Sequence, residues 1–290
     1  EILKSIIEAY RKIRNTIRWM LGVLSNYDQS WVYDYENLDE LEKYMLHSLT
    51  KLQEDVRAAY EAYDYKRVTT LLVNYINLDL SAFYFDIRKD SLYCDPYSSE
   101  KRRSSLYVIN IIFKTISKLY APILSFTMDE VWKNYPFAQD KSIHLSRFEM
   151  VNSKWSNENI NEKWNNVRKL RKTVTAALEI KRRDKEIGSS LEAGTQIYLN
   201  DKEIIASVTD IDLAEICITS SFELINKKPD SKCFVLDEQP EIGVIVRIAS
   251  GKKCKRSWKV TQDVGLDSEY PELSKRDADA VREFLSMSQN

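Results

Sequence analysis

Glycine is nearly absent from the N-terminal part of the chain, where Gly22 is the only glycine before residue 188. Apolar residues in this part recur every three or four positions, the spacing that places side chains on one face of an α-helix. Segment 2–24 shows this spacing at Leu3, Ile6, Tyr10, Ile13, Ile17, Met20 and Leu24. Long helices with one apolar face suit an antiparallel bundle, so we expect the chain to begin with one.

The same reasoning predicts the remaining helices of the bundle. They are expected over residues 38–63, 66–86 and 104–119, followed by a short helix. Asn37 with Glu40, and Thr127 with Glu130, have the spacing of capping pairs, and we expect them to start two of these helices.

The character of the sequence changes near residue 188. One more helix, strongly basic, is expected over 161–187 with Gly188 as its C-terminal cap. Short segments rich in β-branched residues and bounded by turn residues follow, at 195–200, 215–225 and 243–250, and are typical of strands. A last helix is expected near 275–287. The predicted fold class is therefore mainly α: an antiparallel helical bundle, then a small α/β domain and a tail.

Charge is spread unevenly, although the net charge is only −1. Residues 28–64 hold ten acids and three bases, whereas residues 161–190 hold nine bases and four acids. Residues 251–260 hold five bases and no acid. Basic stripes on a nearly neutral chain suit the binding of a polyanion to one face. Charge alone nevertheless favours the plainer interpretation, which is ordinary solvated helix faces.

The sequence contains no run of 18 apolar residues and no signal-peptide pattern, so no membrane span or secretion is predicted. The chain begins within a helical pattern and without Met, so we expect a piece of a longer protein. Its four cysteines are far apart and form no C-x-x-C pair, which argues against a disulfide framework. A reducing, cytoplasmic location is expected.

The residues give little support for catalysis. Only two histidines occur, His47 and His144, and we expect both to be packed structural residues. No glycine-rich phosphate loop and no Ser–His–Asp or Cys–His set can be assigned. The residues alone therefore predict a binding module.

Arginine and aromatic side chains supply the candidate binding surface. Arg11, Arg14 and Arg18 recur at steps of three and four, so they form one stripe beside the apolar face of their helix. Guanidinium groups match phosphate oxygens, and bases of single-stranded RNA stack on aromatic rings. For Trp19 there is an alternative interpretation, in which the side chain packs in the core and does not contact RNA. The predicted RNA-contacting residues are Arg11, Arg14, Arg18, Trp19, Arg102, Arg103, Arg171, Lys172, Arg182, Arg183, Arg256 and Trp258.

Several runs of sequence, in order, resemble the C-terminal part of bacterial isoleucyl-tRNA synthetases, a class I synthetase family. They are EAYRKIRNTIRWMLG (8–22), LSAFYFDIRKDSLYCD (80–95), KRRSS (101–105), LYAPILSFTMDEVW (119–132), SIHLSRF (142–148), VRKLRKTVTAALEIKRRDKEIGSSLEA (167–193) and KKCKRSWKVTQDVG (252–265). The early helical runs are shared more weakly by the valyl, leucyl and methionyl families. The runs IGSSLEA and KKCKRSW point to the isoleucyl family in particular.

The resemblance implies four regions. Residues 1–158 are expected to form the helical anticodon-binding domain, 159–192 a basic connecting helix, 193–250 a small α/β domain and 251–290 a zinc-finger-like tail. The family joins isoleucine to its tRNA with ATP and Mg²⁺, using HIGH-like and KMSKS-like motifs that do not occur here. We therefore expect this stretch to bind isoleucine tRNA without catalysing the reaction. We also expect it to be monomeric and off the membrane, joined to the catalytic domain of the same full-length chain.

The resemblance also implies a zinc site in the tail, made by four cysteine thiolates. In this chain the corresponding positions hold Cys254, Ser257, Ser274 and Asp277. Serine is a poor zinc ligand, and one thiolate with one carboxylate falls short of the four donors of a structural site. A degenerate site without zinc is expected, in a tail that folds by local packing around Trp258 and Val260 and keeps its basic and aromatic residues for tRNA contact. The alternative is a vestigial, partly disordered tail that contacts nothing.

Two other functions remain open on the sequence. One is a helical protein–protein interaction scaffold with no RNA role. The other is the equivalent part of a valyl- or leucyl-tRNA synthetase, which the tail sequence argues against.

Overall fold

A computed structural model describes residues 2–227 and 233–287 of the 290-residue chain. The chain divides into two compact units. The first unit comprises residues 1–92 and 98–158, and the second comprises residues 93–97 and 159–290. Within the described residues the first unit is helical, and the second combines helices with a small sheet. The predicted mainly α fold with a small α/β part is thus confirmed, while the predicted four-region division stays a prediction.

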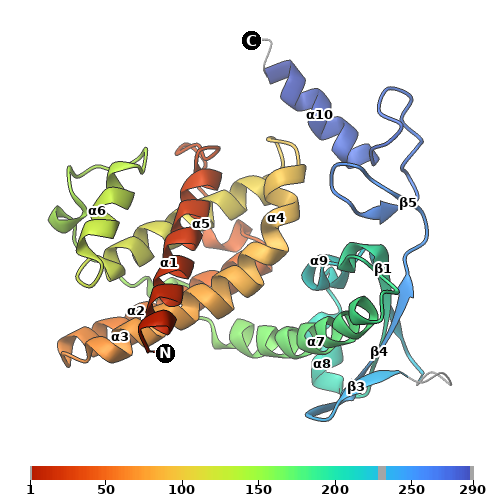
Figure 1. The fold of residues 1–290 in the computed structure, drawn as a ribbon, viewed down its shortest axis with the longest axis horizontal. Helices are drawn as coiled ribbons and strands as arrows, with labels where there is room; N and C mark the ends of the chain where they lie inside the picture. Colours follow the sequence, from red (N-terminus) through yellow and green to blue (C-terminus); the bar gives the residue numbers. More distant parts are fainter. Residues whose placement is uncertain (1, 228–232, 288–290) are drawn as a thin grey trace. The chain divides into compact units, whose positions relative to one another are not determined.

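The first unit is a bundle of packed helices (Figure 1). Its α-helices are α1 (Ile2–Leu24), α2 (Glu40–Glu61), α3 (Tyr65–Asn74), α4 (Phe85–Cys94), α5 (Glu100–Tyr120) and α6 (Ser125–Lys133). Helix α5 packs against α1, α2 and α6, and it lies at the centre of the bundle. Its inward residues include Ile109, Phe113 and Ile116, none of which is exposed, so this helix supplies much of the apolar core.

The helix predicted over 66–86 is longer than expected. Its backbone continues from α3 through a π-helical segment (Tyr75–Tyr84) into α4 and ends at Cys94. Short 3₁₀ turns occur at Tyr35–Asn37, Ile143–Leu145 and Ser153–Trp155.

Both predicted capping pairs are wrong. Helix α2 begins after Asp39, and no side chain caps it. Helix α6 begins at Ser125, so Thr127 and Glu130 lie inside it. There they serve another purpose, because the Thr127 hydroxyl lies 3.0 Å from the Tyr10 hydroxyl and thereby links α6 to α1.

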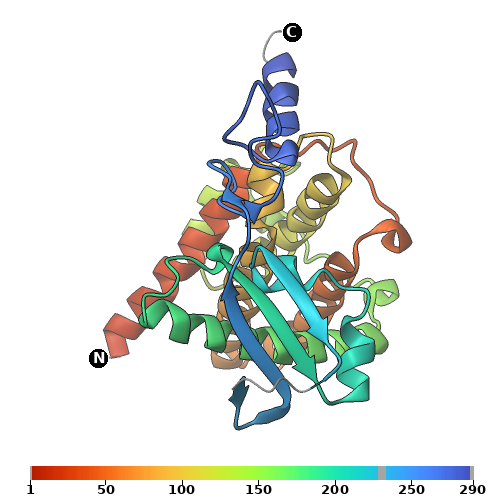
Figure 2. The ribbon, with the colours of Figure 1, turned by 90° about the vertical axis from the view of Figure 1, so that its right-hand side faces the viewer.

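The second unit builds a four-stranded sheet in the order β2-β1-β4-β3 (Figure 2). Its strands are β1 (Ala193–Leu199), β2 (Ser221–Ile225), β3 (Phe234–Leu236) and β4 (Gln239–Ile248). Strands β1 and β2 are parallel, and the chain crosses between them through α8 (Lys202–Val208) and α9 (Leu213–Cys217). Strands β1 and β4 pair antiparallel, with Ile197 opposite Val244.

Helix α7 (Glu158–Arg183) lies on one face of this sheet (Figures 1 and 2). Trp164, Val167, Leu170 and Val174 form its buried stripe, which explains the spacing of apolar residues in a basic helix. The helix was predicted to reach residue 187 with Gly188 as its cap. It ends earlier, and the nearby residue with a left-handed backbone is Lys185, at φ 60°.

The strand predicted over 215–225 is only partly correct. Its first residues belong to α9, and only Ser221–Ile225 is a strand. The reason is the Asp212 side chain, which accepts hydrogen bonds from the backbone amides of Ala214 and Glu215 and so starts a helix.

The tail follows the sheet. It contains a two-stranded ribbon of β5 (Lys252–Lys253) and β6 (Val260–Thr261), then α10 (Lys275–Met287), which matches the predicted last helix.

Candidate nucleic-acid interface

The predicted arginine stripe lies on the exposed face of α1. Arg11, Arg14 and Arg18 are exposed, whereas Ile13 and Ile17 are buried against the bundle. This arrangement follows from the helical repeat, because the arginines are offset by one residue from the apolar positions. The sequence therefore places three cations on one side of the first helix.

Helix α6 faces two of these arginines across a hollow. Arg14 and Arg18 line a cavity of about 460 Å³ together with Thr127 and Asn134. Glu130 also lines it, and its carboxylate contacts both terminal nitrogens of Arg14, at 3.3 and 3.4 Å. Because this ion pair is exposed to solvent, it contributes little to stability. A phosphate can therefore compete with Glu130 for the guanidinium of Arg14.

Phe126 is a candidate that the sequence reasoning missed. It is 96% exposed and lies one residue before Thr127 at the start of α6. Met128, Val131 and Trp132 form the buried face of this helix, and Phe126 does not fit their three- and four-residue spacing. That mismatch is the signal that could have identified it. Exposed aromatic rings and arginines are the side chains that bind single-stranded nucleic acid, and Phe126 lies on the same helix as Thr127 and Asn134 of the hollow.

Trp19 has a mixed environment. Its ring lies 4.3 Å from the ring of Phe85, centroid to centroid, and the side chain is half-buried. Lys89 lines the small cavity of about 200 Å³ beside it. Trp19 thus packs in the bundle while part of its side chain stays accessible to solvent.

The two arginines that open α5 differ in exposure. Arg102 is only 7% exposed, so RNA contact would require the side chain to move outward. Arg103 is half-buried, and its guanidinium lies over the Trp31 ring at 5.1 Å from the centroid. Arg103 is therefore the better placed of the two.

The basic residues of α7 also divide into two kinds. Arg171 donates from Nε to the carbonyl of Ile216 at 2.8 Å, so it holds the C-terminal end of α9. Lys172 is exposed and pairs with Glu238 at 2.8 Å. Arg182 and Arg183 are exposed near the end of the helix and pair with acids on the same segment. Exposed pairs of this kind exchange readily for a phosphate.

The expected packing of the tail around Trp258 is wrong, because this side chain is mostly exposed, whereas Val260 is half-buried. Trp258 is 62% exposed, and its backbone is left-handed with φ 63°. A non-glycine residue in this conformation costs roughly 1–2 kcal/mol, and a mostly exposed ring recovers little of that by packing. Lys255 and Lys259 flank it in sequence and add positive charge.

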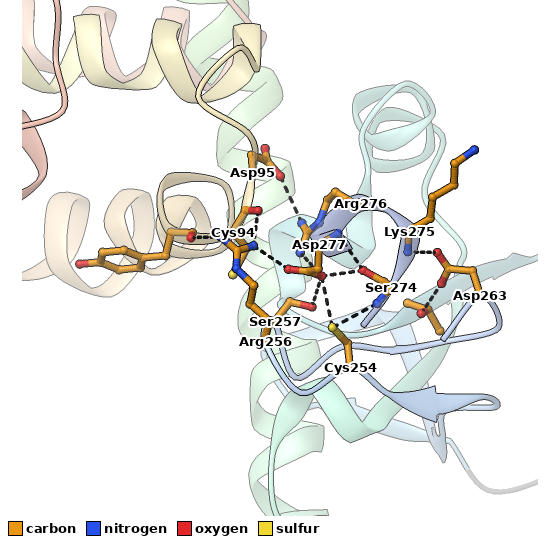
Figure 3. Close-up of polar contacts among 12 residues, drawn as sticks. Cys94, Asp95, Cys254, Arg256, Ser257, Asp263, Ser274, Lys275, Arg276 and Asp277 are labelled. Carbon is orange, nitrogen blue, oxygen red and sulfur yellow. Dashed lines mark hydrogen bonds and ion pairs between the residues drawn. The ribbon is translucent and has the colours of Figure 1, made fainter. Parts of the chain in front are cut away.

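Four separated tail positions meet at one point (Figure 3). We call Cys254, Ser257, Ser274 and Asp277 the Asp277 cluster. The Ser274 and Ser257 hydroxyls lie 2.6 and 2.7 Å from Oδ2 of Asp277, and the Cys254 Sγ lies 3.3 Å from the same atom. The positions that the resemblance grouped as one degenerate site do therefore converge.

Arg256 is joined to this cluster. It donates to Oδ1 of Asp277 at 2.8 Å, to the carbonyl of Cys94 at 2.5 Å and to the carbonyl of Tyr93 at 2.8 Å. These contacts give Arg256 a structural role, and its predicted RNA contact stays a prediction.

The two histidines lie in different surroundings. His144 is exposed, contrary to the expected packing, and its Nε2 lies 3.1 Å from the carbonyl of Ser125. His47 is buried as expected, and its Nδ1 accepts a hydrogen bond from the amide of Asn157 at 3.0 Å.

Among the described residues, no three His, Cys, Asp or Glu side chains gather in a metal-binding arrangement. The four cysteines are thiols and not disulfides. Within the same residues, no helix has the length and apolar character to cross a bilayer.

Comparisons with known proteins give consistent matches. A family model described as "Anticodon-binding domain of tRNA ligase" matches residues 42–199. Isoleucine–tRNA ligase of Bradyrhizobium diazoefficiens is 47% identical over 287 residues, which is 99% of this chain and 29% of that protein. The ligases of Agrobacterium fabrum and Bartonella henselae are each 46% identical, over 99% and 98% of this chain. The chain spans less than a third of the length of these relatives.

Proposed function

This chain belongs to the anticodon-binding domain family of tRNA ligases, and from that membership we infer that it is the tRNA-binding portion of an isoleucine–tRNA ligase. The resemblance seen in the sequence is confirmed at the level of the family. The isoleucine specificity is our proposal, and the identity of 46–47% to ligases of that name supports it.

The observation that carries the proposal is the hollow between α1 and α6. It presents Arg14 and Arg18, and α6, the helix on its other side, also carries the exposed ring of Phe126. Guanidinium groups bind backbone phosphates, and an exposed ring stacks on a base that is not paired. A tRNA anticodon loop offers both kinds of partner at once.

The tail is proposed to add a second contact. Trp258 keeps an unfavourable backbone conformation while its ring faces solvent, which suits a ring held ready for stacking on RNA. The exposed cations of α7, Lys172, Arg182 and Arg183, are proposed to bind phosphates of the same tRNA. Arg11, Trp19 and Arg103 remain candidates for the helical unit.

We propose that the full-length protein attaches isoleucine to its tRNA with ATP and Mg²⁺, and so acts in translation in the cytoplasm. Catalysis then belongs to a domain elsewhere in the full-length chain. Residues 1–158 are the proposed anticodon-binding domain, followed by the connecting helix (159–192), the α/β domain (193–250) and the tail (251–290). We propose a monomer whose partners are isoleucine tRNA and that catalytic domain, with no membrane contact.

A mobility-shift assay with the 290-residue chain tests this function. The expected result is binding to isoleucine tRNA that weakens steeply with salt, because each phosphate contact releases counterions. A variant tRNA with a swapped anticodon is the matched control and is expected to bind more weakly. Equal affinity for both would contradict anticodon reading and leave general tRNA binding. No binding in dilute buffer would contradict the RNA role and favour a protein-interaction scaffold, whereas preference for valine or leucine tRNA would favour a different ligase.

A further inference from the structure

The residues of the Asp277 cluster do not fit a zinc ion. A structural zinc site needs four donors, usually thiolates or imidazoles, whereas the cluster offers one thiol, one carboxylate and two hydroxyls. The Cys254 Sγ is also engaged as a thiol, because it lies 3.3 Å from the Asp277 carboxylate and accepts the Ser274 amide at 3.3 Å.

The charges around the cluster also oppose a metal. The guanidinium groups of Arg256 and Arg276 lie 2.8 and 3.3 Å from the Asp277 carboxylate. A divalent cation at this point would face two positive charges within a few ångströms, in a site that solvent does not screen. The carboxylate already has its counter-charges.

In a zinc site, the metal binds ligands from separated segments and so holds these segments together. Here the carboxylate of Asp277 does this by accepting hydrogen bonds from separated segments. It is completely buried, and its oxygens accept hydrogen bonds from the loop after β5 and from the residue before α10. Burial alone would raise its pKa, but hydrogen bonds from Ser274 and Ser257 and the charge of Arg276 lower the pKa to about 2. The group is therefore ionised at neutral pH, as a centre of this kind requires.

The position of Asp277 in its helix strengthens the arrangement. Asp277 lies in the first turn of α10, where the helix dipole favours a negative charge. Its own amide donates to the Ser274 hydroxyl at 3.3 Å while that hydroxyl donates to its carboxylate, which is a reciprocal arrangement like a capping box. The same centre reaches the last two residues of α4, because Arg256 donates hydrogen bonds to the carbonyls of Tyr93 and Cys94.

We propose that the buried carboxylate of Asp277 replaces a metal ion as the centre that organises the tail, so that residues 254–278 hold their fold without zinc. The proposal goes beyond tRNA binding and concerns how the tail is held together.

Hydrogen exchange of the backbone amides of Cys254, Trp258 and Ser274 tests the proposal in the 290-residue chain. Asp277→Asn keeps the size of the side chain but removes its charge and turns one acceptor into a donor. Exchange at these amides should become about ten- to a hundredfold faster, the effect expected when buried donors lose a charged acceptor. Asp279→Asn, two residues further along α10 at an exposed position, is the matched control and should leave exchange unchanged. Equal exchange in the two variants would overturn the proposal.

Metal analysis gives an independent test. Protein purified without chelator should contain no stoichiometric zinc, and a chelator should leave the same amides equally protected. One zinc per chain, or loss of protection on chelation, would overturn the proposal. The triple variant Ser257→Cys, Ser274→Cys, Asp277→Cys should instead bind one zinc and become chelator-sensitive, because the four positions converge. A folded triple variant that takes up no zinc would contradict that convergence. These measurements involve no RNA, so their outcome is independent of the proposed tRNA binding.

Discussion

Arg88 forms a buried ion pair with Glu42 inside the helical unit, where neither side chain has appreciable contact with solvent. Nε of Arg88 donates to Oε1 of Glu42 at 2.8 Å, and a second nitrogen reaches Oε2. The hydroxyls of Tyr84 and Ser105 each donate to Oε1 at 2.9 Å. The pair joins α2 to α4, and Ser105 adds α5, so the buried carboxylate of Glu42 is shared by these helices.

Removing Arg88 should therefore destabilise the bundle strongly. In Arg88→Met the Glu42 charge stays buried without its guanidinium partner, and we expect a loss of about 3–5 kcal/mol in the free energy of unfolding. Urea unfolding followed by circular dichroism measures it. Lys89→Met, one residue further at an exposed pair with Asp86, is the control and should change stability by less than about 0.5 kcal/mol. Similar losses in both variants would show that the buried pair is not special.

This network marks the limit of prediction from the sequence. The helices were predictable because apolar residues repeat with the helical period. Glu42 and Arg88 carry no such signal, since charged residues far apart in the chain give no indication that they meet in the core. Local hydrogen bonds were also mispredicted. The Asp212 side chain starts helix α9 where a strand was expected. Thr127 was expected to start α6, but it lies inside that helix and its hydroxyl pairs with the hydroxyl of Tyr10 on α1.

The candidate binding surface was predictable in part, because the helical repeat also determines which charged residues share a face. Arg14 and Arg18 share a face of α1 through their spacing alone, so the sequence was sufficient to predict the stripe. The hollow with α6 depends on tertiary packing and could not be predicted in this way. The convergence of Cys254 and Asp277 followed from the family spacing, but the role of the carboxylate as a common acceptor became visible only in three dimensions.

The two histidines provide a matched test of pH dependence. Burial lowers the pKa of His47 below its ordinary value of 6.5, so the folded state binds fewer protons than the unfolded state. Stability should then fall as the pH drops below about 6.5, because the unfolded state takes up the proton first. His47→Gln should remove part of the decrease in unfolding free energy between about pH 7.5 and about pH 5.5. His144→Gln, at an exposed position, should retain it in full. Identical pH profiles for the two variants would contradict this role of His47.

The ion pair between Arg14 and Glu130 leads to opposite predictions for its two partners. Arg14→Ala should weaken tRNA binding and reduce the salt slope, by roughly 0.7–0.9 for each phosphate that the variant no longer binds. Glu130→Gln should strengthen binding, because it removes a negative charge that competes with phosphate for the same guanidinium. Both are measured as dissociation constants over a salt series. Weaker binding in both variants would mean that the pair acts as a structural unit and not as a phosphate site.

Phe126 separates binding from stability. Because the side chain is 96% exposed, Phe126→Ala should leave the melting temperature nearly unchanged. If the ring stacks on a base, the variant should lose about 1–3 kcal/mol of RNA-binding free energy. Leu145→Ala, at another exposed apolar position, controls for a general loss of surface hydrophobicity. An unchanged affinity in Phe126→Ala would exclude stacking at this position.

Trp258 should affect the stability of the tail and the affinity for tRNA in opposite directions. Its backbone conformation is unfavourable for stability, whereas its ring is expected to favour tRNA binding. Glycine adopts a φ of 63° without steric cost, so Trp258→Gly should stabilise the tail or leave it unchanged, as measured by hydrogen exchange at the amides of Cys254 and Ser274. The same variant should bind tRNA more weakly by about 1–3 kcal/mol if the ring stacks on a base. Trp258→Phe keeps an aromatic ring on the same backbone and should retain most of the affinity. A tail that loses protection in Trp258→Gly would show that the ring packs for stability, and an unchanged affinity would show that it does not contact RNA.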